Sequence, residues 1–180
     1  AARPVTPVPV IGDFAGGSMY LVVGVLAALI ARGTTGRGQV VDAAMVDGAA
    51  HLFTMVHGLL GTGAWRDERE ANLLDGGAPF YAVYECADGK FVAVGALEPE
   101  FWAELVTGLG VDVPGEQYDP DTWEAQRAAF AAAFRTRSRD EWAEHFEGTD
   151  ACVAPVLSLR EAPRHPHAVG RGSFVADVNG

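Results

Sequence analysis

The sequence predicts a mixed α/β fold that divides near residue 75, with helices before this point and a small α+β unit after it. Two observations support the division. The apolar run Met19–Ala31 is typical of a helix, whereas Pro79–Ala96 holds two runs rich in valine, tyrosine and phenylalanine around the hairpin-turn pair Asp88-Gly89. The first part has no strands of its own to complete a layer, so we expect it to belong to a larger domain.

The first part is expected to be largely helical. The glycine-rich stretch 12–18 and the apolar run after it indicate a helix start, with Ser18 as N-cap and Gly33 as the left-handed residue that ends the helix. The apolar run, 13 residues long, is too short to span a bilayer and predicts a helix buried on all sides. Residues 40–63 are expected to begin as a strand and to continue as a helix.

Local signals also define the elements of the second part. We expect a helix from Glu98-Pro99 to Gly110, a helix over residues 120–135, a helix from the capping box Ser138–Glu141 to Glu147, and a short strand over Cys152–Leu157. Residues 165–180 are expected to form an irregular connector.

Composition limits the classes of partner. The net charge is −11 and Lys90 is the only lysine, so the clustered cations that nucleic acids require are missing. Cys86 and Cys152 lack metal-ligand spacing, and we expect two reduced, buried thiols in a cytoplasmic protein, with no metal site. Asp13, rather than a basic region, precedes the apolar run, so we expect neither a signal peptide nor a membrane partner.

Asp13 is the first candidate for chemistry. It lies in IGDFAGG, between an apolar segment and the expected helix start, where free N–H groups stabilise negative charge. A carboxylate that removes a proton from carbon would suit this place, because donors for a developing oxyanion lie beside it. The alternative is an aspartate that only caps the helix.

Glu98 is the second candidate, at the end of a predicted strand and directly before Pro99. Carboxylates at strand ends often face a cleft, although an acid that caps the next helix is the alternative. Glu100 is a weaker candidate. His51 and His57 lie in an apolar helix and are expected to serve in packing or at an interface, and no nucleotide-binding or serine-hydrolase motif is present.

Four stretches taken together resemble one family. They are IGDFAGGSMYLVVGVLAAL, TGRGQVVDAAMVDG, NLLDGGAPFYAVYECADGKFVAVGALEPEFW and TDACVAPVL. They resemble the α-methylacyl-CoA racemases, a branch of the class III coenzyme-A transferase (CaiB/BaiF) superfamily. The resemblance covers about residues 7 to 175.

The resemblance implies a CaiB/BaiF-like architecture, with part of a Rossmann-like large domain joined by a helical linker to a small α+β domain. The implied boundaries are 1–43 for the remnant of the coenzyme-A-binding domain, 44–78 for the linker, 79–165 for the small domain and 166–180 for the return linker. It also implies an interlocked homodimer, and a substrate that itself contains coenzyme A, so that no separate cofactor is needed.

The resemblance further implies interconversion of (R)- and (S)-2-methylacyl-CoA thioesters by 1,1-proton transfer through an enolate. Asp13 matches one of the two bases, Glu98 matches the residue that supports the second base, a histidine, and N–H groups near Gly16 and Gly17 could stabilise the enolate oxygen. Only twelve residues precede Asp13 and none is histidine, so we expect a fragment without the coenzyme-A-binding part and with negligible activity alone.

Two other functions stay open. The first is a class III coenzyme-A transferase, in which Asp13 would act as a nucleophile and form an anhydride and then an enzyme thioester. Transferases of the superfamily tend to carry a run of glycines after the strand that ends at Gly95, whereas this sequence has ALEPEFW. The second is a non-enzymatic interaction domain, in which Asp13 and Glu98 only cap helices.

Overall fold

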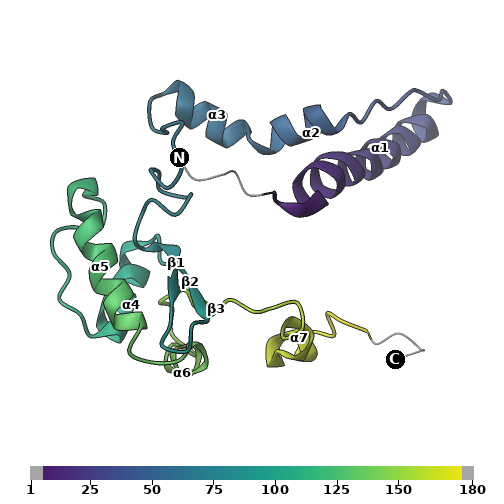
Figure 1. Ribbon diagram of the computed structural model, residues 1–180. Coiled ribbons are helices and arrows are strands. Elements are labelled where there is room, and N and C mark those ends of the chain that lie inside the picture. Colours follow the sequence, from purple (N-terminus) through teal and green to yellow (C-terminus); the bar gives the residue numbers. More distant parts are fainter. Residues whose placement is uncertain (1–5, 176–180) are drawn as a thin grey trace. The chain divides into compact units, whose positions relative to one another are not determined.

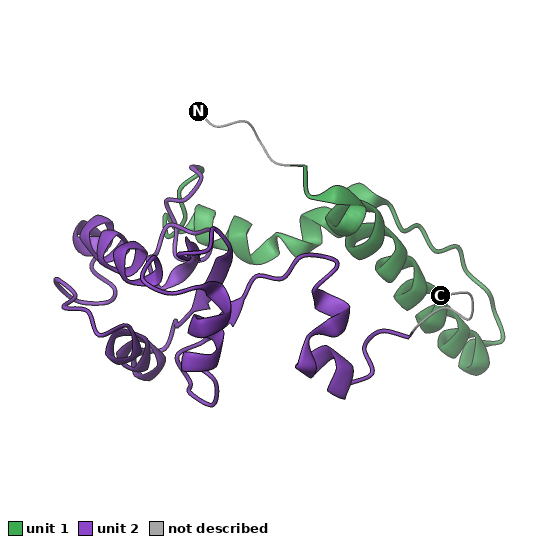
Figure 2. Cartoon of the chain, turned by 60° about the horizontal axis from the view of Figure 1, so that its bottom comes forward, with its two compact units in different colours: residues 1–67 green, residues 68–180 purple. Residues whose placement is uncertain are grey.

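The computed structural model describes residues 6–175, and the chain forms two compact units, residues 1–67 and residues 68–180 (Figure 2). The point of division lies inside the segment 44–78 that the sequence predicts as a linker. The four predicted domain boundaries stay predictions. Each unit is described by itself.

One long helical stretch dominates unit 1 (Figure 1). It consists of η1 (Val8–Val10), the π-helix η2 (Ile11–Met19) and α1 (Tyr20–Thr35). The predicted N-cap is wrong, because the Ser18 hydroxyl lies inside the π-helix and donates to the Asp13 carbonyl at 3.0 Å. The predicted C-cap is wrong as well. Gly33 is helical, and Gly36 adopts the left-handed conformation (φ 69°) that ends the helix.

The length and exposure of this stretch correct two further expectations. None of the α1 residues is buried, and Val23 and Ile30 are 62% and 76% exposed, so the helix is not enclosed within this chain. Because the glycine-rich segment is itself helical, the stretch Val8–Thr35 has 28 residues and contains an 18-residue window with a mean hydropathy of 2.1. By length and composition alone it could cross a membrane. That no membrane partner exists stays a prediction.

Two short helices complete unit 1. They are α2 (Met45–Leu52) and α3 (Thr54–Gly61), separated at Phe53, whose backbone leaves the helical conformation (φ −90°, ψ 10°). The strand expected at the beginning of residues 40–63 does not form. Val40 is 93% exposed, and the part of unit 1 that is described offers this segment no strand with which to pair.

Unit 2 is built on a three-stranded antiparallel sheet in the order β1-β2-β3 (Figure 1). The strands are β1 (Tyr81–Glu85), β2 (Phe91–Gly95) and β3 (Val153–Pro155). The predicted hairpin is confirmed: Tyr81 pairs with Gly95, and Gly89 supplies the positive φ of 73° that the turn needs. The predicted strand at 152–157 is confirmed with shorter bounds.

Helices cover one face of the sheet. They are α4 (Pro99–Leu109), η3 (Pro120–Thr122), α5 (Trp123–Phe134) and α6 (Arg139–His145). The predicted helix end at Gly110 is confirmed, with Gly110 as a left-handed cap, and the capping box of Ser138 and Glu141 forms as predicted. The connector expected after residue 165 is wrong in part, because η4 (Ala162–Arg164) is followed there by α7 (Pro166–Gly170). The core centres on Phe80, Tyr84, Val92, Val94, Leu105, Phe130, Phe134 and Trp142.

Candidate functional site

Asp13 lies in the first turn of the π-helix of unit 1, with its side chain exposed. Among the described residues, no hydrogen bond or ion pair involves its carboxylate, so the alternative of a capping aspartate finds no support. Helices with i→i+5 hydrogen bonds are rare and are frequent at functional sites. The structure therefore presents Asp13 as an accessible carboxylate on an unusual backbone.

Gly16 and Gly17 have a structural role that the sequence did not reveal. Both are buried where η2 crosses α2, and a Cβ on Gly16 would lie 2.8 Å from the backbone nitrogen of Ala49. They lie inside the π-helix instead of ahead of a helix start, so the premise of free N–H groups beside them is wrong. Their predicted contact with an enolate oxygen stays a prediction, but it is no longer supported by free N–H groups of a helix start.

Glu98 occupies the N-cap position of α4 in unit 2, directly after the short link that follows β2. Its side chain is exposed and makes no capping hydrogen bond, so the capping alternative finds no support here either. Its charge acts on the thiol of Cys152. Partial burial raises the pKa of Cys152, and the negative charges of Glu98, Asp150 and Glu104 raise it further.

The two thiols differ in their surroundings. Cys86 is buried, as predicted, whereas the prediction for Cys152 is wrong, because this residue is exposed, directly before β3. Cys152 has a positive φ of 52°, and its carbonyl accepts a hydrogen bond from the Gly95 nitrogen at 3.0 Å. Cys152 thus lies at the edge of the sheet, and its backbone has a conformation that residues other than glycine seldom adopt.

An open pocket of about 790 Å³ lies on the sheet face that the helices leave uncovered. The side chains of this face alternate with Tyr84, Val92 and Val94, which point into the core. The only sign of this pocket in the sequence is weak: the two strands of the hairpin carry apolar residues on both faces. The wall of the pocket includes Tyr81, Val83, Ala93, Gly95 and Ala154 from the strands, with Glu70, Asp75, Arg127 and Cys152 beside them.

Asp75 and Arg127 hold the loop that borders this pocket. The Asp75 carboxylate accepts hydrogen bonds from the backbone nitrogens of Asn72 and Gly77 at 2.9 and 3.0 Å. Burial alone would raise the pKa of Asp75, but the hydrogen bonds that it accepts outweigh burial and lower it. Arg127 donates to the carbonyls of Gly76 and Gly77, at 2.6 Å each. Sequence reasoning missed both residues.

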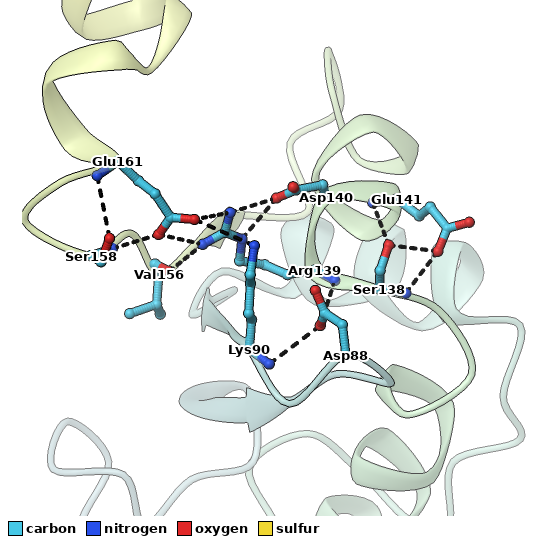
Figure 3. Close-up of polar contacts among 9 residues, drawn as sticks. All are labelled: Asp88, Lys90, Ser138, Arg139, Asp140, Glu141, Val156, Ser158 and Glu161. Carbon is cyan, nitrogen blue, oxygen red and sulfur yellow. Dashed lines mark hydrogen bonds and ion pairs between the residues drawn. The ribbon is translucent and has the colours of Figure 1, made fainter.

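A polar network fixes the chain beyond β3 (Figure 3). The buried Arg139 guanidinium binds both carboxylate oxygens of Glu161 at 2.9 and 3.0 Å, and it also donates to the Val156 carbonyl. Asp88 of the hairpin turn accepts from the Arg139 backbone nitrogen at 3.2 Å. The hydrogen bonds from Arg139 hold the pKa of Glu161 far below its ordinary value. No local signal links residues so far apart in sequence.

Asp13 and Glu98, the two predicted site carboxylates, thus belong to different units. Within residues 6–175, no three histidine, cysteine, aspartate or glutamate side chains gather in a way that could hold a metal ion. Each carboxylate is exposed and unpaired among the described residues, and the roles predicted for both stay predictions.

Comparisons with known proteins agree with one family. The chain is 44% identical to the α-methylacyl-CoA racemase of Homo sapiens over 175 residues, and it spans 46% of that relative's length. Its fold matches the orthorhombic crystal form of Rv3272 from Mycobacterium tuberculosis with a TM-score of 0.70 at 18% identity, over 95% of this chain and 45% of that chain.

A CaiB/BaiF family protein from Brucella suis matches with a TM-score of 0.63 at 23% identity, over 96% of this chain and 46% of that chain. These structures support a mixed α/β partial fold of the CaiB/BaiF type, as the sequence predicts. The family model described as CoA-transferase family III matches residues 1–179. The chain therefore belongs to CoA-transferase family III.

Proposed function

We propose that this chain supplies part of the active site of a racemase that interconverts (R)- and (S)-2-methylacyl-CoA thioesters. The observation that carries the proposal is the 44% identity to the human racemase across 96% of the chain. Within that similarity, Asp13 is an exposed carboxylate without a partner among the described residues.

The chemistry asks for such a group. A thioester makes its α-hydrogen removable, because the carbanion delocalises onto the carbonyl oxygen as an enolate. Racemisation then needs one proton-transfer group on each face of the planar enolate, each acting as base for one enantiomer and as acid for the other. In the proposal, Asp13 serves one face, a histidine outside this chain serves the other, and Glu98 supports that histidine.

The other parts of the proposal follow from the family. The substrate is an acyl-CoA, no further cofactor takes part, and the complete enzyme is an interlocked homodimer. Its cytoplasmic location is proposed separately, from the reduced thiols that the sequence predicts. A coenzyme-A transferase would use the same Asp13 as a nucleophile. The link from β2 to α4 favours the racemase, since Ala96, Leu97 and Glu98 connect the two elements without a run of glycines.

The test uses a chimaera in which this chain replaces the matching segment of the human racemase. Exchange of the α-proton with deuterated solvent is measured separately for each enantiomer of a 2-methylacyl-CoA. We expect exchange by the chimaera and negligible exchange by the 180-residue chain alone. Asp13→Asn should suppress exchange from one enantiomer by at least about 10²-fold and affect the other less.

Asp47→Asn is the matched control, because it removes another exposed carboxylate from the first turn of a helix in unit 1. It should leave both exchange rates near those of the chimaera. Equal loss for both enantiomers with Asp13→Asn would contradict the two-base scheme. A covalent coenzyme-A adduct on Asp13, detected by mass spectrometry, would favour the transferase instead.

A further inference from the structure

We propose that Gly48 is a positioning residue for Asp13, acting through a direct backbone contact between α2 and the π-helix. This inference rests on the proposed function, since it concerns the group that removes the α-proton. Gly48 is buried, belongs to α2 and makes no use of a side chain. Because Gly48 has no Cβ, the backbones of α2 and the π-helix can approach each other closely where they cross.

The contact at this crossing leaves no room for a side chain. A Cβ on Gly48 would lie 1.9 Å from the carbonyl oxygen of Gly16, 2.7 Å from its carbonyl carbon and 2.9 Å from its Cα. All three are backbone atoms, which cannot rotate away as the end of a flexible side chain can. Gly17 differs, because a Cβ there would meet the Met45 side chain, at 2.9 Å.

The displaced backbone is the one that carries Asp13. Gly16 follows Asp13 by three residues in the same π-helix, so a shift of the Gly16 carbonyl moves the turn to which Asp13 belongs. On the other side of the crossing, the Tyr20 hydroxyl lies 2.5 Å from Nδ1 of His51, and the two rings meet edge to face at 5.6 Å. This contact holds the start of α1 against the end of α2. A Cβ added at Gly48 should therefore displace the π-helix mainly on the side of Gly16 that carries Asp13.

The expected size of the effect follows from the distances. The Cβ must move from 1.9 Å to beyond 3.0 Å from the Gly16 oxygen, which requires a shift of about 1 Å. Misplacement of a catalytic group by about 1 Å can lower a rate about 10²-fold. We therefore expect Gly48→Ala to lower exchange by about 10²-fold, although alanine is the better helix former.

The closing experiment compares Gly48→Ala with Gly33→Ala and Gly58→Ala in the chimaera. Gly33 and Gly58 are also helical, and a Cβ at either position meets no atom within 4 Å. For each protein, α-proton exchange is measured for both enantiomers, with circular dichroism and the thermal midpoint as measures of folding. Loss of folded protein lowers both exchange rates equally, whereas displacement of Asp13 lowers one more than the other.

We expect Gly48→Ala to suppress exchange from the same enantiomer that Asp13→Asn affects, and both controls to exchange normally. Tyr20→Phe, which keeps the ring and removes the hydrogen bond to His51, is a milder variant should Gly48→Ala not fold. It should lower exchange from that enantiomer by a smaller factor, and an unchanged ratio between the enantiomers would then overturn the proposal.

The two proposals fail in distinguishable ways. If the unsubstituted chimaera exchanges neither enantiomer, the proposed function fails and the positioning role falls with it. If the chimaera exchanges both, but folded Gly48→Ala matches Gly33→Ala or loses both rates equally, only the role of Gly48 is overturned.

Discussion

Replacement of Trp142 by phenylalanine should destabilise unit 2 by about 2–4 kcal/mol, mainly through one orphaned carbonyl. Trp142 is 2% exposed, and its indole nitrogen donates to the Phe134 carbonyl at 2.8 Å. Phe134 is the last residue of α5, where carbonyls lack partners within the helix. Loss of the donor leaves this buried acceptor unpaired at a cost of about 1–3 kcal/mol, and the smaller ring loses about 1 kcal/mol of burial.

Trp102 in α4 offers a matched control. It is half-buried, and its buried indole nitrogen has no hydrogen-bond partner among the residues described. Trp102→Phe also shrinks an indole to a phenyl ring, but it leaves no acceptor unpaired and removes an unpaired donor. We expect it to cost less than about 1 kcal/mol. The difference between the two variants then reports the hydrogen bond of Trp142.

Equilibrium unfolding in urea, followed by circular dichroism, measures both variants in the 180-residue chain. For a slope of about 2 kcal/mol per molar urea, Trp142→Phe should lower the midpoint by about 1–2 M, and Trp102→Phe by less than about 0.5 M. Equal shifts for the two variants would refute the reasoning, because they would show that ring size alone, and not the capped carbonyl, determines the cost.

Three further predictions concern charges of unit 2. The folded-state pKa of Glu161 is depressed, so its stabilising contribution is present above the unfolded value of about 4.3 and is lost as pH falls. Glu161→Gln should therefore lower the thermal midpoint at pH 7 and flatten its fall below pH about 5, and an unchanged acid slope would contradict this. Cys152 should react slowly with iodoacetamide at pH 7 despite its exposure, and Glu98→Gln should speed the reaction. Peptide mapping by mass spectrometry checks this, and reaction at the rate of a free thiol would refute it. Arg127→Met should destabilise unit 2 by about 2 kcal/mol and expose the loop at residues 70–78 to protease, since two hydrogen bonds of a charged group are lost. Cleavage at the wild-type rate would count against that role.

Local chemistry was sufficient to predict much of unit 2. Asp88-Gly89 permits only a narrow set of turns, Pro99 fits a first helical turn, and Gly110 accepts the left-handed conformation that ends α4. Each signal acts within a few residues and needs no partner elsewhere in the chain. The hairpin, the capping box and α4 therefore formed as predicted, and the candidate carboxylates were found from the same neighbouring motifs.

Unit 1 shows what the sequence alone could not determine. Its glycine-rich stretch was predicted to precede a helix that starts at Ser18, and glycine is a poor helix former. In the structure the stretch is a π-helix, and Gly16 and Gly48 allow its backbone to approach α2 closely, a tertiary contact that local propensity does not reveal.

The sequence by itself determined the family, the hairpin, α4 and the capping box of unit 2, and the two candidate acids. The tertiary structure alone decided the helical register beneath Asp13, the exposure of Cys152 and the pairing of Arg139 with Glu161. The physical reason is the sequence separation over which each interaction acts. Turn and capping preferences depend on atoms a few bonds apart, whereas close packing and buried ion pairs depend on residues that only folding brings together.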